Sequence, residues 1–293
     1  MTSQLPPPKA ILFDIGGVCV VSPFQAILDY EHENNIPVGW VNFAIQKGPQ
    51  NGAWQLIERG ECELNDDWFR AFKAQLSIPK HWKEYCIKAA VKSCAEKGLS
   101  TNSEAVVGHE QAPPVPEIDA KKLFWRMMRM SREPDPWMYP ALKTLKESGR
   151  FVLGALSNTI AFPTGIKDDE GALFKKGLVH KPHPNPYAND PTDIADVFDV
   201  FISSAHVGLR KPDPKAYAMA VQEMSRVAVM RGMGEVRVEE VLFLDDIGVN
   251  LKWAKICGLR TIKVDLGKTR EAVRELERQV GLGLLGENEK ARL

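Results

Sequence analysis

The chain has 293 residues, which is long for one typical domain and short for three, so a core with an inserted module is expected. Lys and Arg total 38, as do Asp and Glu, so zero net charge excludes a global field that attracts nucleic acid or anionic membrane. The five cysteines form no C-x-x-C pair, and no apolar run approaches the length of a membrane span. We therefore expect a reduced, cytoplasmic protein that acts through a local site, without nucleic-acid or membrane partners.

The first predicted element is a buried strand that ends on a single carboxylate. The apolar run at residues 10–13 is followed at once by Asp14, and then by Gly16 and Gly17. Continuous apolar runs suit strands buried on both faces of a parallel sheet, where ligands bind beyond the carboxyl ends of the strands. We therefore expect Asp14 at the rim of a crevice. The alternative is an Asp that only forms a turn before the two glycines.

A helical region follows, from residue 23 to about residue 130. Apolar residues recur there with the roughly 3.6-residue spacing of a helix, and no convincing strand interrupts them. Residues 95–118 are poor in this periodicity and contain several Gly and Pro, which predicts a long loop.

From residue 134 the pattern alternates between helices and strands. Helices are expected at 140–148, 215–229 and 251–257, and strands at 151–156, 197–202, 241–244 and 260–264. Residues 163–193 predict a long surface loop. This rhythm implies parallel strands with right-handed crossovers. The predicted fold is α/β, a doubly wound, Rossmann-like parallel sheet from residues 1–22 and 134–293, with an inserted α-helical cap domain at 23–133.

Polar side chains follow the predicted strands and one loop. They are Asp14, Ser157 with Asn158, Lys211, and Asp245 with Asp246. Because the carboxyl ends of parallel strands share one edge, these groups should meet in one crevice. The three carboxylates would hold an oxygen-loving ion such as Mg²⁺, and Ser157 and Lys211 would hold phosphoryl oxygens. Asp14 would be the nucleophile and would form an aspartyl-phosphate that water then hydrolyses.

Each of these groups also has a purely structural interpretation. Asp245 and Asp246 could cap the helix that follows them. Lys211 could be a surface lysine, although its place before Pro-Asp-Pro puts it on a rigid turn. Ser157 could satisfy only local backbone groups.

In their order along the chain, these motifs resemble those of the haloacid dehalogenase superfamily of hydrolases. The motifs are FDIGGV with Asp14, LSNT with Ser157, KPDP with Lys211, and LDDIGVN with Asp245 and Asp246. The runs KPDPKAY and LDDIGVNLK are similar to runs in the phosphatase-like N-terminal domain of soluble epoxide hydrolases. Beside that domain, residues 95–118, 163–195 and 230–237 look like extra loops. We expect no epoxide hydrolase domain, since the chain ends soon after the last motif.

The resemblance implies a Mg²⁺-dependent phosphohydrolase that acts on a small phosphorylated metabolite beneath the cap. Asp14 and Lys211 would be catalytic, and Ser157, Asn158, Lys211 and Gly17 would bind phosphate. The metal ligands would be Asp14, the carbonyl of Gly16, Asp245 and Asp246, with Asp246 as the better candidate of the last pair. The run ERGECE, residues 58–63, lies where caps often place a substrate-facing turn, but solvated surface is the simpler expectation.

One departure from the family pattern leaves two functions open. Family phosphatases usually read D-x-D, and the second Asp acts as general acid and base, whereas Gly16 stands at that position here. The alternative is therefore a catalytically degenerate member that binds a phosphorylated ligand or a partner. A dehalogenase would suit the family name but not the residues, because halide chemistry needs no metal, whereas the paired acids at 245 and 246 make sense mainly with one.

Two further expectations concern location and assembly. The last three residues, Ala291-Arg292-Leu293, resemble a C-terminal peroxisomal targeting signal with the pattern small, basic, Leu. A peroxisomal location is therefore an alternative to the cytoplasmic one. The sequence leaves open whether the chain forms a homodimer.

Overall fold

The computed structural model describes residues 7–97, 112–180, 187, 189–190 and 193–285. The C-terminal Ala291-Arg292-Leu293 lies outside the described residues, as do residues 98–111 of the first predicted long loop and residues 181–186, 188 and 191–192 of the second. The chain divides into two compact units. The core unit takes residues 1–23, 58–61 and 128–293, and the helical unit takes residues 24–57 and 62–127. That the helical unit caps the site stays a prediction.

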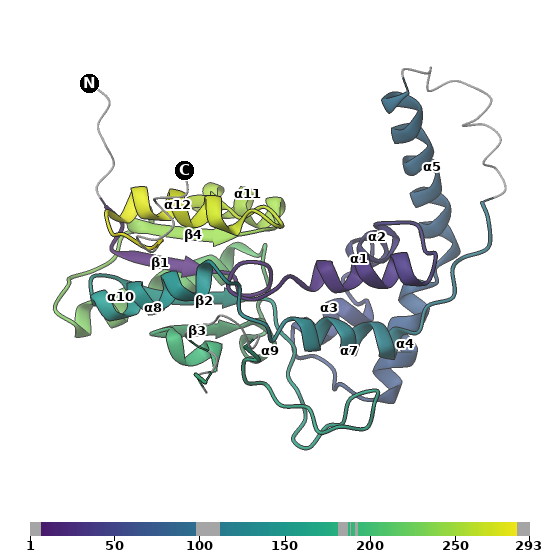
Figure 1. Cartoon of the computed structure of the whole chain (residues 1–293), viewed down its shortest axis with the longest axis horizontal. Coiled ribbons are helices and arrows are strands. Elements are labelled where there is room, and N and C mark those ends of the chain that lie inside the picture. Colours follow the sequence, from purple (N-terminus) through teal and green to yellow (C-terminus); the bar gives the residue numbers. More distant parts are fainter. Residues whose placement is uncertain (1–6, 98–111, 181–186, 188, 191–192, 286–293) are drawn as a thin grey trace. The chain divides into compact units, whose positions relative to one another are not determined.

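The core unit is built on a five-stranded parallel sheet with the order β3-β2-β1-β4-β5 (Figure 1). The strands are β1 (Ala10–Phe13), β2 (Val152–Ser157), β3 (Val200–Ser203), β4 (Val241–Asp245) and β5 (Arg260–Lys263). The predicted doubly wound α/β fold is confirmed. The third strand starts at Val200 rather than residue 197, because the Asp193 side chain accepts from the Ala195 amide and caps a 3-10 helix, η2 (Ile194–Val197).

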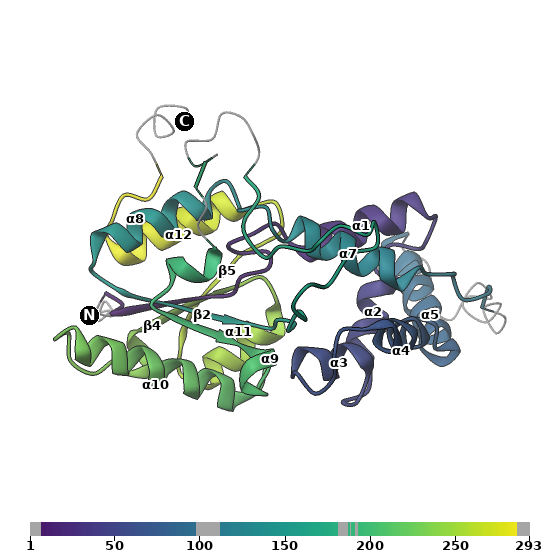
Figure 2. The ribbon, with the colours of Figure 1, turned by 90° about the horizontal axis from the view of Figure 1, so that it is seen from below.

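Helices cover both faces of this sheet, as Figure 2 shows. One face packs on α8 (Met138–Ser148) and α12 (Thr269–Val280), and the other on α10 (Pro214–Met230) and α11 (Gly248–Ile256). Ile11 and Phe13 of β1 face the first pair, whereas Leu12 faces the second. Since both faces are buried, the strands read as continuous apolar runs rather than alternating ones. The short elements α9 (Ser204–Val207) and η3 (Val238–Glu240) precede α10 and β4.

In its described residues the helical unit contains helices and no strand, as predicted. Its helices are α1 (Pro23–Glu33), α2 (Trp40–Gln46), α3 (Ala53–Glu58), α4 (Asp66–Leu76), α5 (Pro79–Glu96) and α7 (Ala120–Met130), whose ends at Pro23, Glu58 and Met128–Met130 fall in the core unit. Aromatic rings form much of its interior, with Trp68 within 5.0 Å of Phe72 and 5.1 Å of Phe124, centroid to centroid. Among the described helices, none is both long enough and apolar enough to cross a membrane.

Candidate active site

The carboxyl ends of β1 and β4 bring together two carboxylates and one ammonium. Asp14 directly follows β1 and Asp245 ends β4, and these strands are paired so that Phe13 lies opposite Leu244. The Nζ atom of Lys211 lies 2.8 Å from Asp14 Oδ1 and 2.7 Å from Asp245 Oδ2. All three residues are buried, so these are charge-assisted contacts in a region of low dielectric. The predicted meeting of Asp14, Lys211 and Asp245 is thus observed.

Burial and charge shift the pKa values of this cluster. Burial raises the pKa of Asp14 to about 6, although Lys211 counteracts the shift. Burial alone would lower the pKa of Lys211, but the two adjacent carboxylates outweigh it and raise that pKa. Lys211 is therefore held as a cation between two acids, which suits a group that binds an anion.

Asp245 is already surrounded by hydrogen-bond donors. Its carboxylate accepts from Lys211, from the Ile247 amide at 2.7 Å, and from Asn250 Nδ2 at 3.1 Å to each oxygen. Asn250 is a site residue for which the sequence patterns predicted no role. Its place in LDDIGVN, on the helix that follows the acids, was the available signal.

Asp246 differs from its neighbour. Its Oδ1 atom is buried and has no hydrogen-bond partner among the described residues. Burial, with Asp14 and Asp245 close by, raises the pKa of Asp246 to about 8. One oxygen each from Asp14, Asp245 and Asp246 can lie within 4.8 Å of one another. An unpartnered buried carboxylate is costly unless a cation compensates it, so these residues fit a divalent metal ion.

The two glycines after Asp14 shape the room around these acids. Gly17 has a φ of 78°, and a Cβ atom there would lie 2.4 Å from Asp246 Oδ2. Its amide donates to the Val20 carbonyl at 3.0 Å, so this amide is engaged within its own turn rather than open to a phosphate. Gly16 has no positive φ, and a Cβ atom there would lie 3.3 Å from Pro23 Cδ. Gly17 is therefore needed for close approach, whereas a Cβ atom at Gly16 would be tight against Pro23 and would need a small shift of its ring.

The loop that carries Lys211 is held by Asn158. The Asn158 side chain accepts from the Lys211 amide at 2.8 Å and donates to the Lys211 carbonyl at 3.1 Å. Asn158 therefore positions Lys211, and the second N–H of its Nδ2 is left for a ligand, so its predicted role in binding phosphate stays a prediction. Ser157, the last residue of β2, is buried, and its side chain makes no hydrogen bond to the described residues. The Ser157 hydroxyl thus has capacity for a ligand.

In the run 58–63, where solvated surface was expected, Gly60, Glu61 and Glu63 are exposed, but Glu58 is buried. Glu58 is 7% exposed, and its Oε2 atom lies 2.6 Å from Arg210 Nη2. Gly60 has a φ of 67°, and a Cβ atom there would lie 2.1 Å from the Ala205 carbonyl oxygen. The turn at 58–61 therefore packs on the segment that leads from α9 to Lys211. Glu58 is buried because of these tertiary contacts, and the local sequence Glu-Arg-Gly-Glu gives no sign of that burial.

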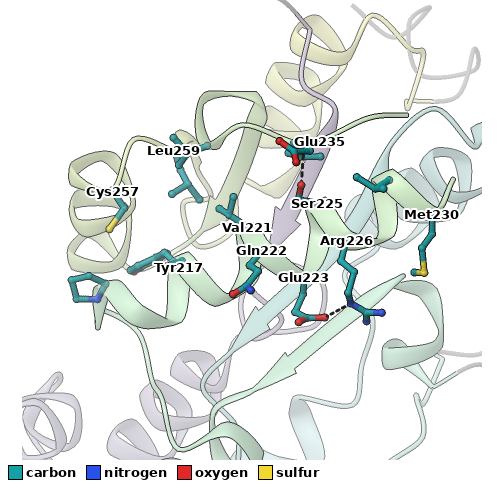
Figure 3. Close-up of a pocket in the computed structure, with 15 residues that line it drawn as sticks. Tyr217, Val221, Gln222, Glu223, Ser225, Arg226, Met230, Glu235, Cys257 and Leu259 are labelled. Carbon is teal, nitrogen blue, oxygen red and sulfur yellow. Dashed lines mark hydrogen bonds and ion pairs between the residues drawn. The ribbon is translucent and has the colours of Figure 1, made fainter. Parts of the chain in front are cut away.

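A groove of about 960 Å³ lies along α10 (Figure 3). Tyr217, Val221, Cys257 and Leu259 help to line it, but none of the predicted site residues does. The polar cluster at the ends of β1 and β4 is therefore a separate site.

The chain thus has a parallel, doubly wound sheet with a Lys among carboxylates at its carboxyl edge. In fold and motif order the chain resembles the haloacid dehalogenase-like hydrolases, as expected. No family model matches it. It is 26% identical over 276 residues, 94% of its length, to mouse (Mus musculus) Acyl-CoA dehydrogenase family member 10. It is 25% identical over 279 residues, also 94% of its length, to Bifunctional epoxide hydrolase 2 of Sus scrofa. These alignments span 19% and 40% of those relatives, respectively.

The chain is also similar to one protein over a shorter stretch of sequence and to two solved structures. Phosphatase MT3486 of Mycobacterium tuberculosis is 37% identical over 79 residues, which is 27% of this chain and 32% of that protein. A crystal structure of a dehalogenase with an intermediate complex has a TM-score of 0.49 at 14% identity, covering 96% of this chain and 100% of that one. A HAD family enzyme from Bacteroides thetaiotaomicron, in complex with magnesium and inorganic phosphate, has a TM-score of 0.41 at 16% identity, covering 89% and 96%.

Proposed function

We propose that this protein is a Mg²⁺-dependent phosphohydrolase that acts on a small phosphorylated metabolite through an aspartyl-phosphate at Asp14. The observation that carries the proposal is the buried Asp14, Lys211 and Asp245 cluster beside the unpartnered oxygen of Asp246. A site with one cation and three acids has a net negative charge, so an anionic phosphate would be repelled without a metal. The likeness to Phosphatase MT3486 supports the same chemistry.

Asp14 is arranged as a nucleophile. Its Oδ1 atom accepts from the Ile15 amide at 2.7 Å and contacts Lys211 at 2.8 Å, while Oδ2 accepts no hydrogen bond from the described residues. One oxygen thus fixes the carboxylate, and the other is available to attack phosphorus. The attack forms a bond between Oδ2 and phosphorus, and the bond from phosphorus to the leaving oxygen breaks. Water then hydrolyses the acyl phosphate and restores Asp14.

Lys211 and Ser157 supply the groups that receive the phosphoryl oxygens. The Lys211 ammonium has three donors, two of which face Asp14 and Asp245, so the third can reach a phosphoryl oxygen. The Ser157 hydroxyl can donate to another. Asp14, Asp246, Asp245 and the carbonyl of Gly16 would hold Mg²⁺, which when bound offsets phosphate charge as a Lewis acid.

The test is release of inorganic phosphate from a panel of phosphoesters with Mg²⁺ and with EDTA. We expect turnover only with Mg²⁺, and a loss of several orders of magnitude in Asp14→Asn, because no neighbouring group replaces a covalent carboxylate. Activity of Asp14→Asn within tenfold of the wild type would contradict the assignment. In Asp246→Asn the Mg²⁺ concentration needed for half-maximal rate should rise.

A second function is favoured by Gly16. If the missing carboxylate has removed turnover, the same Lys211 and Ser157 would bind a phosphorylated ligand without hydrolysing it. Calorimetry with Mg²⁺ and inorganic phosphate separates the two. Tight phosphate binding with no phosphate release from any substrate supports the binding protein and contradicts the enzyme.

A further inference from the structure

Three side chains form a hydrogen-bonded chain at the carboxyl edge of the sheet. Thr159 Oγ1 lies 2.5 Å from Ser203 Oγ, and Ser203 Oγ lies 2.6 Å from His206 Nδ1. They come from the loop after β2, the end of β3 and the short helix α9. Ser203 is 8% exposed, Thr159 is half-buried and His206 is exposed. Two hydroxyls therefore connect an imidazole at the surface with the interior of the core unit.

The inner end of this chain lies on the segment that also carries Ser157 and Asn158. Ser157 and Ser203 are register partners at the ends of the neighbouring strands β2 and β3. Thr159 follows Ser157 by two positions, and the residue between them, Asn158, holds the backbone of Lys211. Thr159 thus belongs to the loop that positions the proposed phosphate-binding groups. Among the described residues, Ser203 is the only side-chain partner of the Thr159 hydroxyl, so this hydroxyl can make one more bond.

The outer end is held by the turn at 58–61. Gly60 packs against the Ala205 carbonyl of α9, and the ion pair between Glu58 and Arg210 joins the turn to the segment after α9. A short helix of four residues is not stable by itself, so these contacts help to hold α9, which carries His206.

These three groups can supply the proton that the candidate active site lacks at Gly16. A general acid contributes about 10²- to 10⁴-fold when the leaving oxygen needs a proton, and Gly16 has no side chain to give one. Imidazole can both give and take a proton near neutral pH. A hydroxyl donates and accepts at once, so it can pass a proton along.

We propose that His206, Ser203 and Thr159 form a proton relay that replaces the carboxylate absent at Gly16. This inference rests on the proposed phosphatase function. As the bond from phosphorus to the leaving oxygen breaks, that oxygen takes the Thr159 hydroxyl proton, Thr159 takes that of Ser203, and Ser203 takes the Nδ1 proton of the His206 imidazolium. In the second half-reaction the proton lost by the attacking water returns along the same chain. Thr159 is then the catalytic residue, and Ser203 and His206 act through it.

The test compares kcat/KM for aryl and alkyl phosphates, since alkyl leaving groups need the proton far more. We expect His206→Gln and Ser203→Ala each to lower the alkyl-to-aryl rate ratio by about 10²-fold. The double variant should lower it no further, because both changes break one relay. Thr159→Val should act like them, whereas Thr159→Ser, which keeps the hydroxyl, should retain the ratio.

Ser225→Ala is the matched control. Ser225, on α10, also accepts from a backbone amide, that of Val236 at 3.0 Å, and lies outside the hydroxyl chain. It should change stability but not the ratio. An unchanged ratio in His206→Gln and Ser203→Ala, with aryl turnover intact, would overturn the relay and leave the network with a structural role only. No aryl turnover by the wild type would instead refute the phosphatase itself.

Discussion

The side-chain amide of Asn158 holds the backbone of Lys211 on both sides, accepting from its N–H at 2.8 Å and donating to its C=O at 3.1 Å. Asn158 lies on the loop after β2, and Lys211 lies between α9 and α10. Two segments that are distant in sequence are thereby fixed together where the proposed chemistry occurs. This contact fixes the backbone from which the Lys211 ammonium extends.

Removing this contact should impair catalysis more than folding. In Asn158→Ala two backbone groups of Lys211 lose their partners, which costs about 1–3 kcal/mol for each group that stays buried and unpaired. A displacement of Lys211 by about 1 Å is enough to cost about 10²-fold in kcat. Steady-state kinetics and thermal unfolding measure the two effects. Asn34→Ala, which removes a bond to the Tyr30 carbonyl in the helical unit, is the control and should leave kcat unchanged. Equal kcat in both variants would contradict the positioning role.

Gly17→Ala should weaken metal binding as well as stability. Its Cβ atom would lie 2.4 Å from Asp246 Oδ2, so the carboxylate must move away. We expect a rise of about tenfold or more in the Mg²⁺ concentration for half-maximal activity, because an oxygen ligand is displaced. The control is Gly165→Ala, which has a similar φ of 76° and nothing within 4 Å of the added Cβ. It should show only the backbone strain of about 1–2 kcal/mol. The same Mg²⁺ dependence in both variants would contradict the contact with Asp246.

The sequence was sufficient to predict that the site lies at the carboxyl edge of the sheet, but not the contacts within the site. Asp14 and Asp245 were expected to meet because they follow apolar runs of a parallel sheet, and pairing of β1 with β4 confirms it. The hydrogen bonds of Asn158 could not be foreseen, since an amide suits a phosphate and a backbone equally well. The burial of Glu58 depends on Arg210, more than a hundred residues away, so no local pattern reports it. The strand order likewise follows from non-local pairing.

The pKa shifts predict how the stability of the metal-free protein depends on pH. The pKa values of Asp14 and Asp246 in the folded protein, about 6 and about 8, lie above those of an unfolded chain. The folded state therefore binds these protons more tightly, and the stability they contribute is lost as pH rises from about 4 to about 8. Above pH 6, Asp246→Asn should become progressively more stable than the wild type in EDTA. Urea unfolding at several pH values measures this difference, and saturating Mg²⁺ should reduce it. A difference that is constant between pH 6 and 8 would contradict the shift assigned to Asp246.

Gly16→Asp should restore the general acid that the family usually places there. Position 16 has no positive φ, and the nearest atom to an added Cβ is Pro23 Cδ at 3.3 Å, so only a small adjustment is needed. We expect the rate for alkyl phosphates to rise by about tenfold or more, and the rate for aryl phosphates to rise much less, because weakly basic leaving groups need little proton donation. The measurement is kcat/KM over a range of leaving-group basicity.

The same substitution also probes the relay. In a His206→Gln background, Gly16→Asp should recover alkyl turnover, since the new carboxylate makes the relay unnecessary. Equal gains for aryl and alkyl substrates would mean that the carboxylate acts in some other way, for example on metal binding.

The central claim is that Asp14 becomes phosphorylated, and acid quenching during turnover of a ³²P-labelled aryl phosphate tests it most directly. An aspartyl-phosphate survives brief acid treatment and is released by hydroxylamine. Reduction with tritiated borohydride displaces the phosphate and leaves a tritium-labelled homoserine, which marks the residue for peptide mapping. We predict that ³²P is bound to the protein only with Mg²⁺, that the tritium label appears on the peptide containing Asp14, and that both labels are absent in Asp14→Asn. Phosphate release without any label on Asp14 in the wild type would contradict the account.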